Sequence, residues 1–180
     1  MEEENPIKEY LFEYIKKSEK KFQKLFSQEK MHLIIQDILD SCYDKASFEN
    51  KEENLGILAT GILHYMLTNA ILNSQRKVEF QGIQVDIVIP DLKTLEKDPK
   101  KSLIICIPKT SDKKTILEKL QMLEKIQPEK QNIWLILTQD RGFQNKTYVV
   151  EKSGNFSNIV FDIAKFANVQ GSNKFKILKI

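Results

Sequence analysis

The sequence predicts an α/β domain with a mixed central sheet, flanking helices and a helical extension at the N-terminus. Apolar residues recur with helical spacing up to residue 73, and short β-branched runs follow from residue 77 onward. A helical pattern also separates an apolar run at 103–107 from another at 132–137. A strand–helix–strand crossover is almost always right-handed and joins parallel strands, so we expect a parallel pair in the sheet.

Length and composition are those of a soluble protein that can bury a sizeable core. The 180 residues fit the ~100–200 residues of a usual domain, and 41% of them are hydrophobic. We expect a helical extension over residues 1–45 and a single compact α/β unit over residues 50–180. The first residues lack the apolar region of a signal peptide, and no apolar run reaches the ~20 residues that span a bilayer. These features predict a cytoplasmic protein with no membrane partner.

The N-terminal part of the chain predicts three helices. Residues 6–26 place apolar side chains at three- and four-residue steps, with lysines on the opposite face. A second helix is expected to begin at an N-cap Ser27 and to end near Cys42, before a polar loop at 43–53. A third helix, over about residues 54–73, is apolar around most of its circumference, which is typical of packing on more than one side.

Two strands are expected next, at 77–80 and 83–89, with a turn at 81–82 between them. Strict alternation in the second strand places Asp86 on the face opposite four apolar residues, namely Ile83, Val85, Ile87 and Ile89. A loop at 91–101 then leads to a strand at 103–107. The remaining pattern predicts a helix at 113–127, strands at 132–137 and 146–150, a helix at 156–168 and an edge strand at 174–180.

The histidine at position 64, the single tryptophan and the two cysteines are predicted to have structural roles. His64 and Trp134 lie in apolar settings and are interpreted as core residues. Cys42 and Cys106 are far apart in apolar segments, which favours buried reduced thiols over a disulfide. The net charge of +3 does not require a nucleic-acid partner. Lysine-rich segments could nevertheless contact phosphate, although the charge pattern alone favours solvated surfaces.

Asp86 and Lys109 are the two residues that suggest a site. Asp86 interrupts an apolar strand, and Lys109 closes the following apolar run. With the order of elements, they resemble the PD-(D/E)xK nuclease superfamily, most closely its restriction-endonuclease-like and archaeal Holliday-junction-resolvase branches. The resemblance covers about residues 50–140 and implies a restriction-endonuclease-like fold.

In that family a helix supplies a glutamate, a strand an aspartate, and the next strand an acid-x-Lys pair. The resemblance implies that Asp86 is the strand aspartate, with Asp91 of the Pro90–Asp91 pair as a second possible register. Lys109 corresponds to the lysine, and Glu53 or Glu52 to the helix glutamate. Ile107, two residues before Lys109, stands where the family has an acid.

The isoleucine bears directly on metal binding. Phosphodiester hydrolysis of this type uses one or two Mg²⁺ ions, which prefer carboxylate and water oxygens as ligands. If the protein is active, Asp86 is expected to hold Mg²⁺ with a relocated acid. Glu118 or Glu124 on the following helix, or Glu53, could supply that acid.

Three functions follow from these interpretations. The preferred one is a nuclease-like domain that has lost catalysis and serves as a DNA- or RNA-binding or assembly module. The second is an active Mg²⁺-dependent endonuclease with a relocated acid. The third is an interaction module that forms a homodimer or docks on a protein partner through the N-terminal helices.

Overall fold

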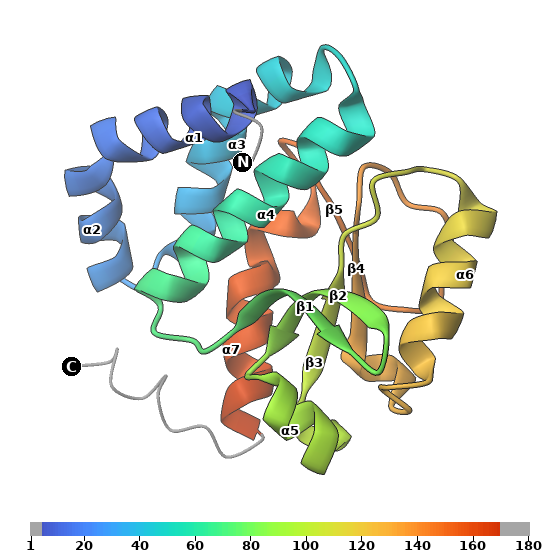
Figure 1. Ribbon diagram of the computed structural model, residues 1–180. Helices are drawn as coiled ribbons and strands as arrows, with labels where there is room; N and C mark the ends of the chain where they lie inside the picture. The colour runs from blue at the N-terminus through green and yellow to red at the C-terminus, as the bar shows by residue number, and fades with distance from the viewer. Residues whose placement is uncertain (1–4, 170–180) are drawn as a thin grey trace.

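A five-stranded mixed sheet forms the centre of the protein, and helices lie on both of its faces (Figure 1). The structure is a computed structural model, and it describes residues 5–169. The strands lie side by side in chain order: β1 (Gln75–Phe80), β2 (Ile83–Ile89), β3 (Leu103–Cys106), β4 (Ile133–Leu137) and β5 (Thr147–Val149). The β1–β2 and β2–β3 pairs are antiparallel, and the β3–β4 and β4–β5 pairs are parallel. The predicted α/β class and the mixed sheet are confirmed.

Most of the helical residues pack on one face of the sheet. This face carries α1 (Pro6–Lys17), α2 (Glu19–Ser27), α3 (Met31–Ser47), α4 (Lys51–Asn69) and α7 (Ile159–Val169). The other face is covered by α6 (Lys113–Glu124), with the short α5 (Leu92–Lys97) beside it. Within residues 5–169, no helix combines the length and the apolar character needed to cross a membrane.

The buried residues form two clusters, one on each face of the sheet. Ile105 and Trp134 belong to the cluster under α3, α4 and α7, whereas their neighbours Ile104 and Leu135 belong to the cluster under α6. This alternation is the period of two expected for strands that are covered on both faces. Trp134 is a core residue, as predicted. Residues from both predicted ranges, 1–45 and 50–180, contribute to the first cluster.

Both cysteines are free and buried, as predicted. Burial raises the pKa of the Cys42 thiol to about 11. Burial, followed by the nearby Asp86 carboxylate, raises the pKa of the Cys106 thiol to about 12. Since the thiolate is the reactive form, both side chains are structural at neutral pH.

The first predicted helix is wrong in one respect, because it is two helices that meet at Ser18. The Ser18 N–H donates to the carbonyl oxygens of Tyr14 and Ile15, and the chain turns there, so that α2 runs at an angle to α1 (Figure 1). Ser27 is not an N-cap; it ends α2, and its hydroxyl donates to the Lys24 carbonyl oxygen at 2.7 Å.

The polar loop predicted at 43–53 is mostly helical. α3 continues to Ser47, because Ala46 is fully buried and the Lys45 ammonium lies 3.9 Å from the centre of the Tyr10 ring on α1. α4 begins at Lys51, which leaves only residues 48–50 between the two helices. Tertiary packing therefore overrides the polar composition of this segment.

The loop predicted at 91–101 contains α5 and a 3₁₀ turn at Pro99–Lys101. Asp91 is the N-cap of α5, and its carboxylate accepts a hydrogen bond from the Thr94 N–H at 2.7 Å. Asp112 caps α6 in the same way, by accepting from the Thr115 N–H at 2.9 Å. Further 3₁₀ turns lie at Lys130–Asn132 and Asn155–Asn158. The edge strand predicted at 174–180 lies outside the described residues.

Candidate functional site

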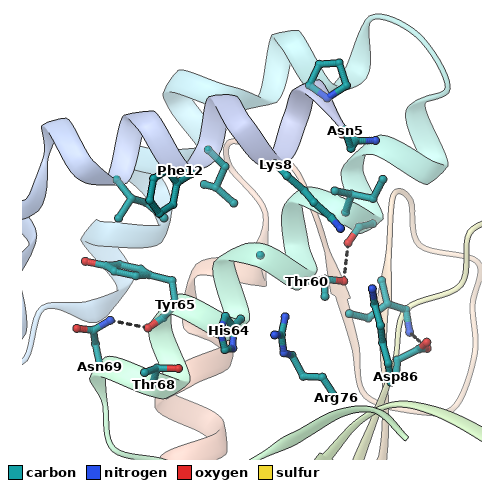
Figure 2. Close-up of a pocket in the computed structure, with 18 of the residues that line it drawn as sticks. Asn5, Lys8, Phe12, Thr60, His64, Tyr65, Thr68, Asn69, Arg76 and Asp86 are labelled. Atoms are coloured by element: carbon teal, nitrogen blue, oxygen red, sulfur yellow. Dashed lines mark hydrogen bonds between the residues drawn. The ribbon is translucent and has the colours of Figure 1, made fainter. Parts of the chain in front are cut away.

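A groove with a volume of about 1180 Å³ lies between α1, α4 and the β1–β3 side of the sheet (Figure 2). We call it the α1–α4 groove. One face of α4 follows its whole length, with lining residues at three- and four-residue steps: Glu53, Gly56, Ile57, Thr60, Gly61, His64, Tyr65, Thr68 and Asn69. At 1.5 Å per residue, this face is about 24 Å long.

Helix α1 forms one wall of the groove because it packs closely on α4. A Cβ atom at Gly61 would lie 2.6 Å from the Leu11 Cδ2 atom, so the glycine permits the approach of the two helices. Leu11 is buried in this contact, whereas Lys8 and Phe12 on the same helix point into the groove (Figure 2). The N-terminal helices therefore shape the groove directly.

The groove brings together Asp86, Lys109 and Glu53, three residues that the sequence analysis singled out. Asp86 comes from β2, Lys109 from the segment after β3, and Glu53 from the first turn of α4. Asp86 is half-buried, whereas the other two side chains are exposed. Their roles as catalytic or binding groups stay predictions.

Ile107 lies beside Asp86 in the groove. The Ile107 N–H donates to the Asp86 Oδ2 atom at 2.8 Å, which joins the end of β3 to β2. The Ile107 side chain is only 6% exposed, and its Cγ2 atom would lie 3.6 Å from a Cβ atom at Gly56. An apolar side chain, packed against α4, therefore occupies the position next to the aspartate.

Other predicted residues lie elsewhere. Glu118 is exposed on α6 and is not a groove residue, so the groove does not bring it together with Asp86. Asp91 caps α5, and Glu52 is not a groove residue either. Within the part of the chain that the structure describes, no three or more His, Cys, Asp or Glu side chains lie close enough to hold a metal ion.

The prediction of strict alternation in β2 is wrong. Ile83 and Val85 belong to the α6-side cluster, whereas Ile87 and Ile89 belong to the α4-side cluster. The change of face falls at Asp86, which stands opposite Lys77 on β1. The backbone of Lys77 is left-handed, with a φ of 49°, which interrupts the regular geometry of the two strands.

A left-handed backbone is uncommon for a residue with a Cβ atom and carries a steric cost. We therefore expect the Lys77→Gly variant to be about 1 kcal/mol more stable than Lys77→Ala. Both substitutions remove the same side chain, and only glycine adopts this backbone without a steric penalty. Urea denaturation of the two variants measures the difference. Glycine usually destabilises a strand relative to alanine. If Lys77→Gly is less stable than Lys77→Ala, the backbone at Lys77 is therefore not strained.

His64 is not a core residue, contrary to the prediction. It is exposed, lines the groove and lies near Arg76 of β1 (Figure 2). Partial burial, and then the positive charge of Arg76, lower the pKa of the His64 imidazole. The ring is therefore neutral at pH 7 and offers the groove a flat polar surface and no additional charge.

The charged residues of the groove are mostly basic. Among the residues that the structure describes, five basic side chains line it, against three acidic ones: Lys8, Lys16, Arg76, Lys77 and Lys109, against Glu19, Glu53 and Asp86. Lys8 and Arg76 point into the groove from its two walls (Figure 2). Sequence reasoning did not identify Lys8, Phe12 or Arg76, because no local pattern distinguishes them from other surface residues.

Comparison of this chain with protein-family models, curated proteins and solved structures finds no match. The fold and the groove together define the class, an α/β protein with a basic, partly apolar groove between its sheet and its N-terminal helices. A function has to be argued from the chemistry of that groove.

Proposed function

We propose that the α1–α4 groove is a nuclease-like site, on a restriction-endonuclease-like fold, that binds nucleic acid without hydrolysing it. The observation that carries this proposal is that Asp86, Lys109, Glu53 and Ile107 all line a single groove. The resemblance to PD-(D/E)xK nucleases implies that an aspartate, a lysine and a helix glutamate share one site. Ile107 is the residue at which this chain differs from the motif of that family, which has an acid at this position.

The donor set argues against tight binding of Mg²⁺. Mg²⁺ requires near-octahedral oxygen ligands, usually including one or two carboxylates. Ile107 offers no side-chain oxygen next to Asp86, and one Asp86 oxygen already accepts the Ile107 N–H. The carboxylate therefore serves first to join two strands, and a metal would have to compete for it.

The charge of the groove supports binding of phosphate. Local excess of positive charge attracts a polyanion even where the net charge of the protein is small. Neutralisation of phosphates by lysine and arginine releases counterions, and this release supplies much of the affinity for nucleic acid. Arg76 on β1 and Lys109 after β3 are both exposed in the groove, where they can contact one phosphate chain.

One observation favours an active Mg²⁺-dependent endonuclease as the second candidate. Glu53 and Asp86 line the same groove, so the helix glutamate is available as the relocated acid. In this case cleavage requires the metal and both carboxylates. Glu118 does not contribute to the groove and does not support this candidate.

Titration of labelled single-stranded, duplex and branched DNA and RNA at two salt concentrations tests the proposal. We expect the affinity to fall roughly 20- to 500-fold between about 50 and 200 mM salt, as for three to five phosphate contacts on single-stranded or duplex probes. Arg76→Ala and Lys109→Ala are each expected to weaken binding and to reduce the salt slope by about 0.7–0.9, because each removes one contact. Asp86→Ala is expected to leave binding intact.

Lys114→Ala is the matched control, because Lys114 is an exposed lysine on α6, on the opposite face of the sheet. It is expected to bind like the native protein. Binding that does not respond to salt, or that responds equally to Lys114→Ala, would contradict the proposal and favour an interaction module. Mg²⁺-dependent cleavage that is lost in Asp86→Ala would favour the second candidate.

A further inference from the structure

We infer that the α1–α4 groove takes a single strand of nucleic acid, with one base stacked on the ring of Phe12 and the neighbouring phosphates held by Lys8 and Arg76. This inference rests on the proposed function and specifies the form of nucleic acid that the groove binds. Phe12, Lys8 and Arg76 all point into the groove (Figure 2).

The shape of the groove suits one strand. It follows α4 from Glu53 to Asn69, over about 24 Å. One strand of B-form DNA carries one phosphate per 3.4 Å of helix axis, so this length corresponds to about seven phosphates at most, and to fewer for an extended strand. α1 stands over one side of the groove and packs on α4 at Gly61, which leaves a channel between helix and sheet.

Phe12 has the placement of a stacking residue. Its side chain is 68% exposed on the wall of the groove, although it is one of the largest apolar side chains of the protein. Single exposed apolar residues are normal on protein surfaces. Among the large exposed apolar residues that the structure describes, Phe12 differs because it lines the groove, and it follows Lys8 by four residues on the same helix. Residues at this spacing lie on one face with Cβ atoms about 5–6 Å apart, so a base and its phosphate can be contacted together.

Across the groove, Tyr65 provides a rigid boundary. Its ring lies 6.2 Å from the Phe22 ring and 5.9 Å from the Phe26 ring, so α2 holds it in place. Sequence-tolerant binding of single strands combines a basic track with aromatic rings on which bases stack. The apolar stretch at Phe12 and Tyr65, beside the basic stretch at Lys8 and Arg76, is this combination.

The test compares three probes of equal length in EDTA: a fluorescein-labelled oligothymidylate of about 15 nucleotides, its abasic analogue, and a duplex. The abasic strand carries the same phosphates without bases. We expect the oligothymidylate to bind about 5- to 150-fold more tightly than the abasic strand, which is the effect of one stacked base. Phe12→Ala is expected to remove this difference and to leave the abasic strand bound as before.

Two variants serve as controls. Phe48→Ala removes another phenylalanine, 85% exposed and outside the groove, and is expected to bind all three probes like the native protein. Phe12→Trp keeps an aromatic face and is expected to retain the preference for the base-bearing strand. Because the Phe12 side chain is mostly exposed, neither of its variants should impair folding, which thermal unfolding verifies.

The outcomes separate this inference from the proposal on which it rests. Equal affinity of the native protein for the two single strands, with salt-sensitive binding of both, would overturn base stacking and retain nucleic-acid binding. Tighter binding of the duplex than of the oligothymidylate would overturn the preference for a single strand. Failure of every probe to bind in a salt-sensitive manner would overturn the proposed function as well.

Discussion

Replacement of Ile107 by glutamate is expected to create a divalent-metal site and to confer metal-dependent strand cleavage on the protein. The new carboxylate would stand beside Asp86, because the Ile107 N–H already lies 2.8 Å from the Asp86 Oδ2 atom. Glu53 and Lys109 line the same groove and would complete the set of residues that the nuclease resemblance implies. Two carboxylates and bound water are the ligands that Mg²⁺ and Mn²⁺ use in such sites.

Without metal, this variant should be less stable than the native protein. The native side chain at this position is 6% exposed, and an ionised group placed there next to Asp86 costs about 2–3 kcal/mol. Mn²⁺ at about 100 times its dissociation constant should restore about 2.7 kcal/mol, since it binds the folded state alone. A metal-dependent rise in the unfolding midpoint, together with the appearance of cleavage products, is therefore the expected result.

Ile107→Gln is the matched control for this experiment. It has nearly the same shape as the glutamate variant but no negative charge, so it should show neither metal stabilisation nor cleavage. The double variant Ile107→Glu, Asp86→Asn should also lose both effects. If Ile107→Glu responds to Mn²⁺ no more than Ile107→Gln does, the groove does not have the geometry of a nuclease site.

Replacement of Gln127 by leucine is expected to reduce the free energy of unfolding by about 3 kcal/mol. Gln127 is fully buried after α6, and its Nε2 group donates to the carbonyl oxygens of Pro99 and Ser102 and to the Ser102 Oγ atom, at 2.9–3.1 Å. Its Oε1 atom accepts from the Glu129 N–H at 3.2 Å. Leucine would leave these buried groups short of partners, and each such loss costs about 1 kcal/mol or more.

For a protein of this size, the loss corresponds to a decrease of about 6–12 °C in the midpoint of thermal unfolding. Gln131→Leu is the matched control, because the exposed Gln131 side chain donates to the exposed Glu129 carboxylate. It should change stability by less than about 0.5 kcal/mol. A similar small change for Gln127→Leu would show that water replaces the lost hydrogen bonds. In that case, Gln127 would not be the residue that joins the segment after α6 to the segment before β3.

Several elements could be predicted because their signals are local. The turn at Gln81–Gly82 requires left-handed backbone, and both residues have a positive φ, of 53° and 75°. The start of α6 depends on a single cap, Asp112, that lies next to the helix it begins. The apolar run of β4 is buried throughout, as a strand covered on both faces must be.

The ends of the helices depended on contacts across the fold, and here prediction failed. α3 extends beyond its predicted end because Ala46 is buried and Lys45 meets Tyr10 on another helix. Gln127, predicted to end a helix, lies in the loop after α6 and bonds to the segment before β3. Partners this far along the chain leave no periodic signal in the sequence.

The candidate site shows the same division. Asp86 and Lys109 could be identified because each interrupts or ends an apolar run, and the groove contains both. Lys8, Phe12 and Arg76 could not be identified from the sequence. Lys8 and Phe12 reach the groove only because α1 packs on α4, and Arg76 reaches it because β1 lies along the same groove. His64 was interpreted as a core residue because its neighbours in sequence are apolar, yet it faces the groove.

Local patterns in the sequence predict the class of the fold, the succession of most helices and strands along the chain, and one acid and one lysine that line the groove. These follow from local periodicity and from caps and turns, whose physical causes lie within a few residues. The structure was needed to show that the N-terminal helices build one wall of the groove and that β2 changes face at Asp86. Those outcomes depend on close packing between distant segments, such as Gly61 against Leu11, which no local pattern encodes.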